Sequence, residues 1–267
     1  MKKILLLLMM ILTISGCGSS ESGDKAAPKI GTLTQLNTTP EQASKYTNGG
    51  TLNFYDNFNS MQMALTSKNI DSIQIYGSVA KYMVANNSDL VISEDQTVQL
   101  VDDFCCAMRK EDDDLRNSFD EAIDAMKADG TLDALIDKYI NDMSNTPKPV
   151  EIAQIDGVET IKVGITGDLP LFDFVLADGT PAGFNTAVLS EISRRIDKNI
   201  ELVRIESGAR AAALTSGLVD VVFWVVVPAD NSDRPKDIDT PEGIAVTEAY
   251  CQDVVVNVNL STLGAGF

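Results

Sequence analysis

The side chains that could do chemistry in this sequence are mainly carboxylates, because the 267 residues include no histidine. Histidine is the commonest general base and the commonest metal ligand in proteins. The four cysteines contain no Cys-x-x-Cys pair, so we predict no thiolate zinc site, no other metal site and no cofactor. An acid–base pair would have to come from Asp168, Glu206 and Glu248, with a pKa raised by its surroundings. This inventory favours binding over catalysis.

The charge balance is strongly acidic, with 21 Lys+Arg against 39 Asp+Glu and a net charge of −18. Proteins bind nucleic acid through clustered lysine and arginine, so we expect no nucleic-acid partner. The length fits one large domain or two small ones. By composition, residues 141–149 (NDMSNTPKP) form a linker between two halves of the chain.

The first seventeen residues have the layout of a secretory signal peptide. Two lysines precede an apolar run over 4–12, which is shorter than the roughly 20 residues that span a bilayer. The next residues, Ile14-Ser15-Gly16-Cys17, resemble the lipobox of bacterial lipoproteins. We therefore predict a signal peptide over 1–16, a lipid anchor at Cys17 and a flexible tether over 17–28. The alternative is an ordinary signal peptide with a chance cysteine.

Two eight-residue segments in the body of the chain resemble each other, residues 64–71 (ALTSKNID) and residues 213–220 (ALTSGLVD). Each follows a helical pattern and precedes a β-rich apolar run, over 73–76 in the first case and over 221–227 in the second. The second run is uninterrupted, as expected for a parallel strand covered on both faces. Because the flanks match as well as the segments, we predict two α/β lobes built alike.

The rest of the hydrophobic pattern predicts strands alternating with helices, which is typical of parallel α/β sheets. Strands are predicted over 29–33, 51–55, 71–76, 90–92, 161–166, 200–205, 219–227 and 254–258, and helices near 40–46, 57–67, 78–86, 185–197 and 208–216. A further helix, with an apolar stripe from Leu115 to Met126, ends at Gly130, and Thr131 is predicted to cap a short helix after it. Cys105 and Cys106 lie in an apolar stretch and are predicted to be buried free thiols.

Several ordered motifs resemble the family-3 solute-binding proteins, which serve ABC importers of amino acids and related polar solutes. Residues 160–259 resemble the first lobe of that family, and residues 29–140 resemble the remainder. The motifs that carry the resemblance are Lys162-Val163-Gly164-Ile165, Asp168-Leu169-Pro170-Leu171-Phe172, Gly183-Phe184-Asn185, residues 214–220 (LTSGLVD), Thr247-Glu248-Ala249-Tyr250, Lys29-Ile30-Gly31, Asn37-Thr38-Thr39 and Ala128-Asp129-Gly130-Thr131-Leu132.

The resemblance implies an α/β fold of two lobes, the type II periplasmic-binding-protein fold, with parallel or mixed sheets flanked by helices. The order of the lobes is reversed, which predicts a circular permutation. Residues 29–140 would form the second lobe with the family's C-terminal strand and helices, 141–158 a linker joining the old termini, and 159–267 the first lobe and a hinge strand. One complete set of segments in one chain favours a monomer, and a swapped dimer of half-modules is the alternative.

The family captures its solute by closing both lobes around it, here with hinge strands near 99–107 and 251–259. The resemblance places Thr38 and Thr39 on a loop that meets the solute, Phe172 beside the cleft, and Tyr76 where the family has the carboxylate that holds an ammonium group. Asp168 or Glu248 could replace that carboxylate, Trp224 could form an apolar wall, and Arg234 could bind a solute carboxylate. The alternatives are a helix cap before Pro40 for Thr38 and Thr39, plain core for Phe172 and Trp224, and a solvated surface side chain for Arg234.

These observations predict a lipid-anchored, extracytoplasmic protein that passes a small polar solute to an ABC permease. An enzyme resembling the periplasmic dehydratases of this superfamily is one alternative. A sensor or structural lipoprotein that binds no solute is another.

Overall fold

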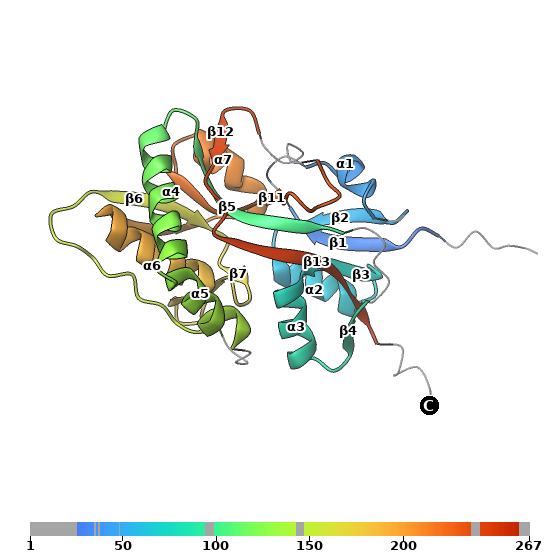
Figure 1. The fold of residues 1–267 in the computed structure, drawn as a ribbon. Helices are drawn as coiled ribbons and strands as arrows, with labels where there is room; N and C mark the ends of the chain where they lie inside the picture. The colour runs from blue at the N-terminus through green and yellow to red at the C-terminus, as the bar shows by residue number, and fades with distance from the viewer. Residues whose placement is uncertain are drawn as a thin grey trace, which may run out of the picture.

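The computed structural model describes residues 26–34, 36, 38–47, 49–93, 99–142, 147–235 and 241–261. Cys17, the predicted signal peptide and most of the predicted tether lie outside these residues and stay predictions. The described chain forms two lobes joined by one continuous ten-stranded sheet, with helices on its faces (Figure 1). We call the lobe built mainly from residues 29–92 lobe A, and the lobe built mainly from residues 147–246 lobe B.

Lobe A is a parallel sheet in the order β2-β1-β3, extended by antiparallel strands. Its alternation of short apolar strands with helices is the pattern that the sequence predicts. Its elements are β1 (Lys29–Leu33), α1 (Pro40–Ser44), β2 (Thr51–Tyr55), α2 (Phe58–Thr66), β3 (Ser72–Tyr76), α3 (Gly77–Asn86) and β4 (Leu90–Ile92). Next to β3 lies β13 (Cys251–Leu260), which comes from the other end of the chain and runs antiparallel.

Lobe B has the same plan, with a parallel sheet in the order β10-β6-β11. Its elements are β6 (Thr160–Ile165), α6 (Phe184–Ile196), β10 (Asn199–Arg204), a 3-10 turn (Ser207–Ala209), α7 (Arg210–Thr215), β11 (Val221–Pro228) and β12 (Ile244–Val246). The antiparallel strand beside β11 is β5 (Val101–Arg109), which belongs to the first half of the chain. After β5 come α4 (Asp113–Ala128), α5 (Thr131–Ile136) and a π-turn (Asp137–Asn141), and α4 and α5 pack on α6.

The two halves of the chain therefore exchange strands. The last strand of each half completes the sheet of the other lobe, and these two strands pair with each other over residues 101–104 and 251–254 (Figure 1). Both expected interlobe strands are confirmed as strands at these positions. One cluster of buried apolar side chains runs through both lobes, so the lobes are packed together in this conformation.

The repeat seen in the sequence forms the same structure in both lobes. Asp71 Oδ2 accepts from the backbone N–H of Lys29 at 2.7 Å, and the backbone N–H of Asp71 donates to Lys29 O at 2.8 Å. Asp220 Oδ2 accepts from the backbone N–H of Lys162 at 2.9 Å, and its own N–H donates to Lys162 O at 2.8 Å. We call each of these two-bond contacts a clasp. Each clasp joins the helix-to-strand turn to the start of the lobe's first strand.

Most predicted elements lie within one or two residues of the observed ones, and the differences have local causes. Thr131 is not a cap: Gly130 is the N-cap residue of α5, with φ 78°, and Thr131 begins the helix. A three-stranded sheet of β7 (Asp168–Leu169), β8 (Asp173–Val175) and β9 (Pro181–Ala182) was not predicted. Strands of two or three residues are too short to show a period of two. The prediction that Cys105 and Cys106 are buried free thiols is confirmed.

Candidate functional site

Four aromatic rings meet where the two lobes face each other, a region we call the seam. Tyr76 comes from the end of β3 in lobe A, Phe172 and Trp224 from lobe B, and Phe104 from β5. Phe104 lies 4.7 Å from Tyr76 and 4.7 Å from Phe172 between ring centroids, and Tyr76 lies 5.7 Å from Trp224. All four rings are buried. At these spacings the rings touch, so they fill this part of the seam themselves.

Three of these rings were candidates from the sequence, and the structure brings them together. Phe172 and Trp224 are also core residues, as their alternative interpretation holds. Phe104 was not among the candidates, because a phenylalanine inside an apolar strand carries no signal of what lies across from it.

Asp168 forms a polar bridge across the seam. Its Oδ2 accepts from the backbone N–H of Phe58 at 2.6 Å, and its side chain is buried. Phe58 is the first residue of α2 in lobe A, so the carboxylate of lobe B lies at a helix N-terminus, where a negative charge is stabilised. Asp168 thus joins the two lobes through one charge-assisted hydrogen bond.

Arg210 forms a second bridge, and sequence reasoning missed it. Its guanidinium donates from Nη2 to Thr34 O in lobe A at 2.6 Å, and from Nη1 and Nε to the carbonyls of Trp224 and Ser207 in its own lobe at 2.7 and 3.1 Å. The residue is 2% exposed, and the guanidinium lies 5.1 Å from the Trp224 ring centroid. The available signal was a single arginine inside the small apolar run 209–214 (ARAAAL), where a solvated side chain has no reason to be.

Asp56 of lobe A makes a further contact between the lobes, beside the Arg210 bridge. Its Oδ1 accepts from Thr34 Oγ1 at 2.9 Å, and its carbonyl accepts from the backbone N–H of Ser207 at 3.4 Å. A Cβ at Gly208 would lie 2.8 Å from Asp56 Oδ1. A larger residue at position 208 would therefore require the carboxylate of Asp56 to move.

Arg234 and the two threonines do not join this cluster. The guanidinium of Arg234 forms a buried ion pair with Asp102 at the start of β5, and Arg234 has a side chain only 9% exposed. The alternative of a solvated surface arginine is therefore wrong. Thr39 is the N-cap of α1: its Oγ1 accepts from Gln42 N at 3.3 Å, and its own N–H donates to Gln42 Oε1 at 2.8 Å. The cap prediction for Thr39 is confirmed, and Thr38 beside it is buried.

Asp173 supports the loop that carries Asp168. Its Oδ2 accepts from the N–H and Oγ1 of Thr166 and from the N–H of Gly167, at 2.8 to 3.1 Å. Its Oδ1 is buried with no hydrogen-bond partner among the described residues. Burial raises the pKa of Asp173 to about 6, against the opposing effect of those hydrogen bonds. Glu206 and Glu248, the other acid–base candidates, are exposed.

The seam thus combines polar groups that bond across it with a cluster of apolar rings. Within the described part of the chain, no three Cys, Asp or Glu side chains gather so that they could hold a metal ion. None of the described helices is long and apolar enough to cross a bilayer.

Residues 34–142 and 161–239 match the family described as bacterial extracellular solute-binding proteins, family 3, which is more than half of the chain. The chain belongs to this family. Both the resemblance and the expected fold, mixed α/β with a curled sheet of the type II periplasmic-binding-protein kind, are confirmed. The protein is therefore a member of a family of extracellular solute-binding proteins.

Solved structures that match the chain include binding proteins and an enzyme. The probable amino-acid ABC transporter extracellular-binding protein ytmK from Bacillus subtilis is 11% identical, with a TM-score of 0.41 over 90% of this chain and 86% of that chain. The putative L-cystine ABC transporter from Listeria monocytogenes is 11% identical, with a TM-score of 0.38 over 90% and 84%. Prephenate dehydratase from Arthrobacter aurescens, in complex with L-Phe, is 11% identical, with a TM-score of 0.37 over 87% and 60%. No curated protein matches the chain.

Proposed function

We propose that this protein is a lipid-anchored, extracytoplasmic solute-binding protein that captures a small polar solute, an amino acid or a related organic acid, for an ABC importer. The seam is the observation that carries the proposal. Two lobes of the family fold, joined by one strand pair, face each other with buried charged side chains on one side and main-chain groups on the other. Membership of an extracellular family supports the location, and the residues before Cys17 support the lipid anchor.

The two bridges across the seam match the two ends of an amino acid. Arg210 holds a carbonyl oxygen of lobe A, and a solute carboxylate would accept from the same guanidinium through two charged oxygens. Asp168 holds an amide of lobe A, and a solute ammonium would donate to the same carboxylate. A solute that enters between parted lobes would replace each bridge, which has one charged partner, by a stronger contact in which both partners are charged. That difference in contacts would favour closure around the solute.

This arrangement accounts for Tyr76 at the position where the resemblance expects a carboxylate. Asp168 supplies the missing charge from the opposite lobe, so the ammonium is not buried unpaired, which would cost several kcal/mol. Tyr76, Phe104, Phe172 and Trp224 would then line the space for the solute's side chain. Four aromatic walls favour an aromatic or large aliphatic side chain.

We further propose that the chain is a monomer with permuted lobe order. Each lobe is completed by a strand from the other half of the same chain, so a single copy contains all the strands of both sheets. The described part of the proposed linker, residues 147–158, lies against lobe B, where the N–H of Val150 donates to Pro181 O and Ile155 bonds the side chain of Asn199, and this supports a join between old termini. Cleavage at a protease site engineered into 143–146 should leave a complex that unfolds in one transition. Two separate transitions would contradict the permutation.

A ligand screen tests the solute-binding proposal. The purified chain without its signal peptide is heated with single amino acids and organic acids, and a bound solute should raise its Tm by mass action. Calorimetry should then show one site, and Arg210→Gln should weaken binding by at least about tenfold through loss of the bidentate contact. Arg194→Gln, on the exposed surface of α6, is the matched control and should leave binding unchanged.

The same experiment separates the alternatives. The methyl ester of the bound solute lacks the carboxylate and should bind the unaltered protein weakly, which tests Arg210 without any folding risk. Solute recovered unchanged supports binding, and solute consumed in an NMR time course would favour the dehydratase-like enzyme. No stabilising solute in the whole panel would favour a sensor or structural lipoprotein. Cys17→Ser tests the anchor separately, because it should move the protein from the membrane fraction to the soluble fraction.

A further inference from the structure

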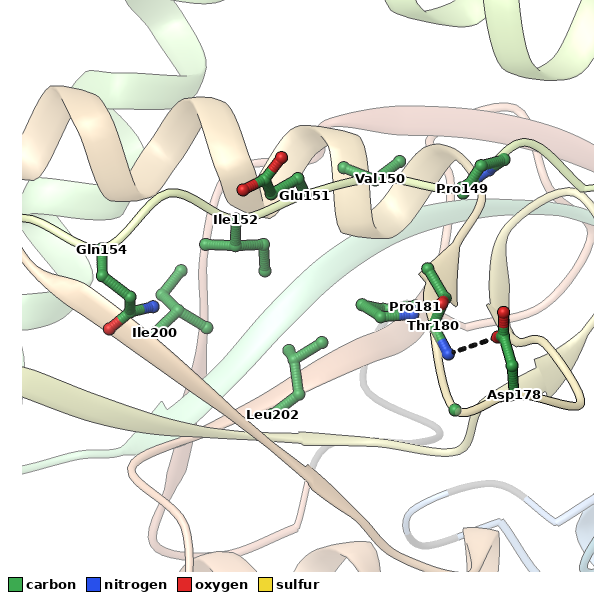
Figure 2. A pocket seen from close by; sticks show the side chains of 11 residues that line it. Pro149, Val150, Glu151, Ile152, Gln154, Asp178, Thr180, Pro181, Ile200 and Leu202 are labelled. Carbon is green, nitrogen blue, oxygen red and sulfur yellow. Dashed lines mark hydrogen bonds between the residues drawn. The ribbon is translucent and has the colours of Figure 1, made fainter.

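A cavity lies on lobe B, away from the seam. It is a groove of about 780 Å³ between the extended segment 149–154 and strand β10, and the turn around residues 178–181 closes one end (Figure 2). Strands β6 and β11 separate β10 from the interlobe strand β5, so the groove is on the outer edge of the sheet. Its volume is in the range of ligand sites in proteins, and the proposed solute-binding function does not use it.

One wall of the groove is an open sheet edge. The backbone N–H groups of Asn199 and Ile205 donate to Glu159 O and Ile165 O at 2.8 Å, toward β6. Because the direction of backbone groups alternates along a strand, the N–H and C=O groups of Ile200, Leu202 and Arg204 point away from β6. Within the described part of the chain β10 pairs with β6 alone, so these backbone groups form an unpaired edge beside the groove.

The opposite wall is held at a distance by its two ends. At one end, Ile155 exchanges two hydrogen bonds with the side-chain amide of Asn199, at 2.7 and 2.9 Å. At the other end, the N–H of Val150 donates to Pro181 O at 2.9 Å, so the segment joins β9 instead of β10. Between these points the segment and β10 diverge. The space between them is lined by Ile152, Ile200 and Leu202, whose side chains point into it (Figure 2).

The charge of the groove has one sign. Glu151 and Asp178 are among its eleven lining residues, and none of the eleven is lysine or arginine. Asp178 Oδ1 accepts from Thr180 N at 2.9 Å, and this bond lowers the pKa of Asp178, so the carboxylate stays ionised. The neighbouring cations are engaged elsewhere: Lys148 pairs with Asp142, and Arg204 Nε donates to Thr166 O at 3.2 Å.

We propose that this groove binds an extended peptide segment of a partner protein, which adds as a strand to the open edge of β10. The edge supplies main-chain hydrogen bonds, the apolar lining takes side chains at alternate positions, and the carboxylates select lysine or arginine between them. The occupant is therefore a short, basic, alternately apolar strand. This surface is independent of solute binding at the seam.

The test uses a fluorescein-labelled peptide, Lys-Val-Lys-Val-Lys-Val, and fluorescence anisotropy at physiological salt. A second peptide of identical sequence and charge carries N-methyl groups at alternate residues, which removes the donors that a strand needs. The first peptide should bind, and the methylated one should bind at least about tenfold more weakly, because charge alone does not distinguish them. Equal affinities would show that only the acidic surface attracts the peptide, which overturns the proposal.

Variants of the protein give a second, independent readout. Leu202→Pro removes an N–H from the unpaired edge of β10. Proline is tolerated on that side of an edge strand, so the variant should fold and lose at least about tenfold in affinity for the peptide. Leu202→Val keeps the N–H and is the matched control, with affinity within about twofold. Glu151→Gln combined with Asp178→Asn should weaken binding and flatten its salt dependence.

Thermal unfolding checks that each variant is folded, and the comparison of the two peptides holds even where a variant is not. Sedimentation tests the other occupant, a second copy of the chain. A dimer that forms at micromolar concentration, disappears in Leu202→Pro and excludes the peptide would overturn the proposal in favour of edge-to-edge pairing between copies.

Discussion

Lobes A and B are built on the same plan, yet they contribute different groups to the seam between them. Each has three parallel strands, a fourth strand from the other half of the chain, and a clasp from its repeat aspartate to its first strand. At the seam, lobe B presents the charged side chains of Asp168 and Arg210, and lobe A presents an amide and a carbonyl of its main chain. The repeated local sequence therefore builds the scaffold, and the residues outside the repeat make the lobes unequal.

Under the proposed function, this inequality would give lobe B the larger part in selecting the solute. Main-chain groups are the same whatever the side chains are, so lobe A offers generic partners. Lobe B carries both charged side chains that bridge the seam, two of the four rings and the small sheet β7-β8-β9 that supports Asp168. Under the proposed function, substitutions of Asp168 or Arg210 in lobe B should change both stability and recognition, and substitutions of the repeat residues in lobe A should change stability alone.

The largest effect is expected from the lobe B ring at the centre of the seam. Trp224→Ala should lower the free energy of unfolding by about 3–5 kcal/mol, because it leaves a cavity among buried rings. Urea denaturation measures this loss. Met63→Ala, at an exposed position of α2 in lobe A, is the control and should change stability by less than about 0.5 kcal/mol. A loss below about 1 kcal/mol for Trp224→Ala would show that the rings do not pack as described.

A pH-dependent effect should come from Asp173, which belongs to lobe B. The pKa of Asp173 is about 6 in the folded protein, above the ordinary value of 3.8. Between pH 3.8 and pH 6 the folded protein therefore keeps a proton on Asp173 that the unfolded chain loses. The contribution of Asp173 to stability is therefore fully present below pH 3.8 and is lost as pH rises through 6, by on the order of 2–3 kcal/mol. The free energy of unfolding is measured from pH 4 to 7 in the unaltered protein and in Asp173→Asn, and the difference between the two pH dependences is the contribution of Asp173. Identical slopes in the two proteins would contradict the buried carboxyl.

The two clasps give a direct comparison of the lobes. Asp220 Oδ1 also accepts from Arg109 Nη2 at 3.3 Å, a contact that comes with the exchanged strand β5. Asp220→Ala should therefore cost about 2 kcal/mol, and Asp71→Ala about 1 kcal/mol, in free energy of unfolding. The exposed Asp124→Ala on α4 is the control, with little change expected. Equal losses at both clasps would mean that Arg109 adds nothing to lobe B.

The smallest change in the free energy of unfolding is expected from substitutions in the turn of each repeat. Lys68 has φ 60° and Gly217 has φ 73°, so the same left-handed position is held by lysine in lobe A and by glycine in lobe B. Lys68→Gly should raise the free energy of unfolding by up to about 1 kcal/mol, and Gly217→Lys should lower it by a similar amount. Thermal unfolding of the two variants and of the exchange double variant measures the difference. A loss of stability in Lys68→Gly would contradict this account of the turn.

Sequence reasoning succeeded where a residue's role depends on its near neighbours in the chain. The cap at Thr39 needs only Gln42 three residues later, and both clasps belong to segments that the repeat had already marked. Sequence reasoning failed where a residue's role depends on a partner that is distant in the chain and close in space. In the sequence, Arg234 has the surroundings of a solvated surface arginine. In the structure it forms a buried ion pair with Asp102, more than a hundred residues away in the chain. Arg210 and Phe104 were missed for the same reason.

By itself, the sequence determined the alternation of strands and helices, the repeat that makes two similar lobes, the acidic charge and the family motifs. These follow from composition, hydrophobic period and short-range hydrogen bonds, which act within a few residues. Only the tertiary structure decided that the halves exchange β5 and β13, that Asp168 and Arg210 bridge the seam, and that β10 keeps an open edge beside a groove. Each of these depends on strand pairing and burial between residues far apart in the chain, and no local pattern records them.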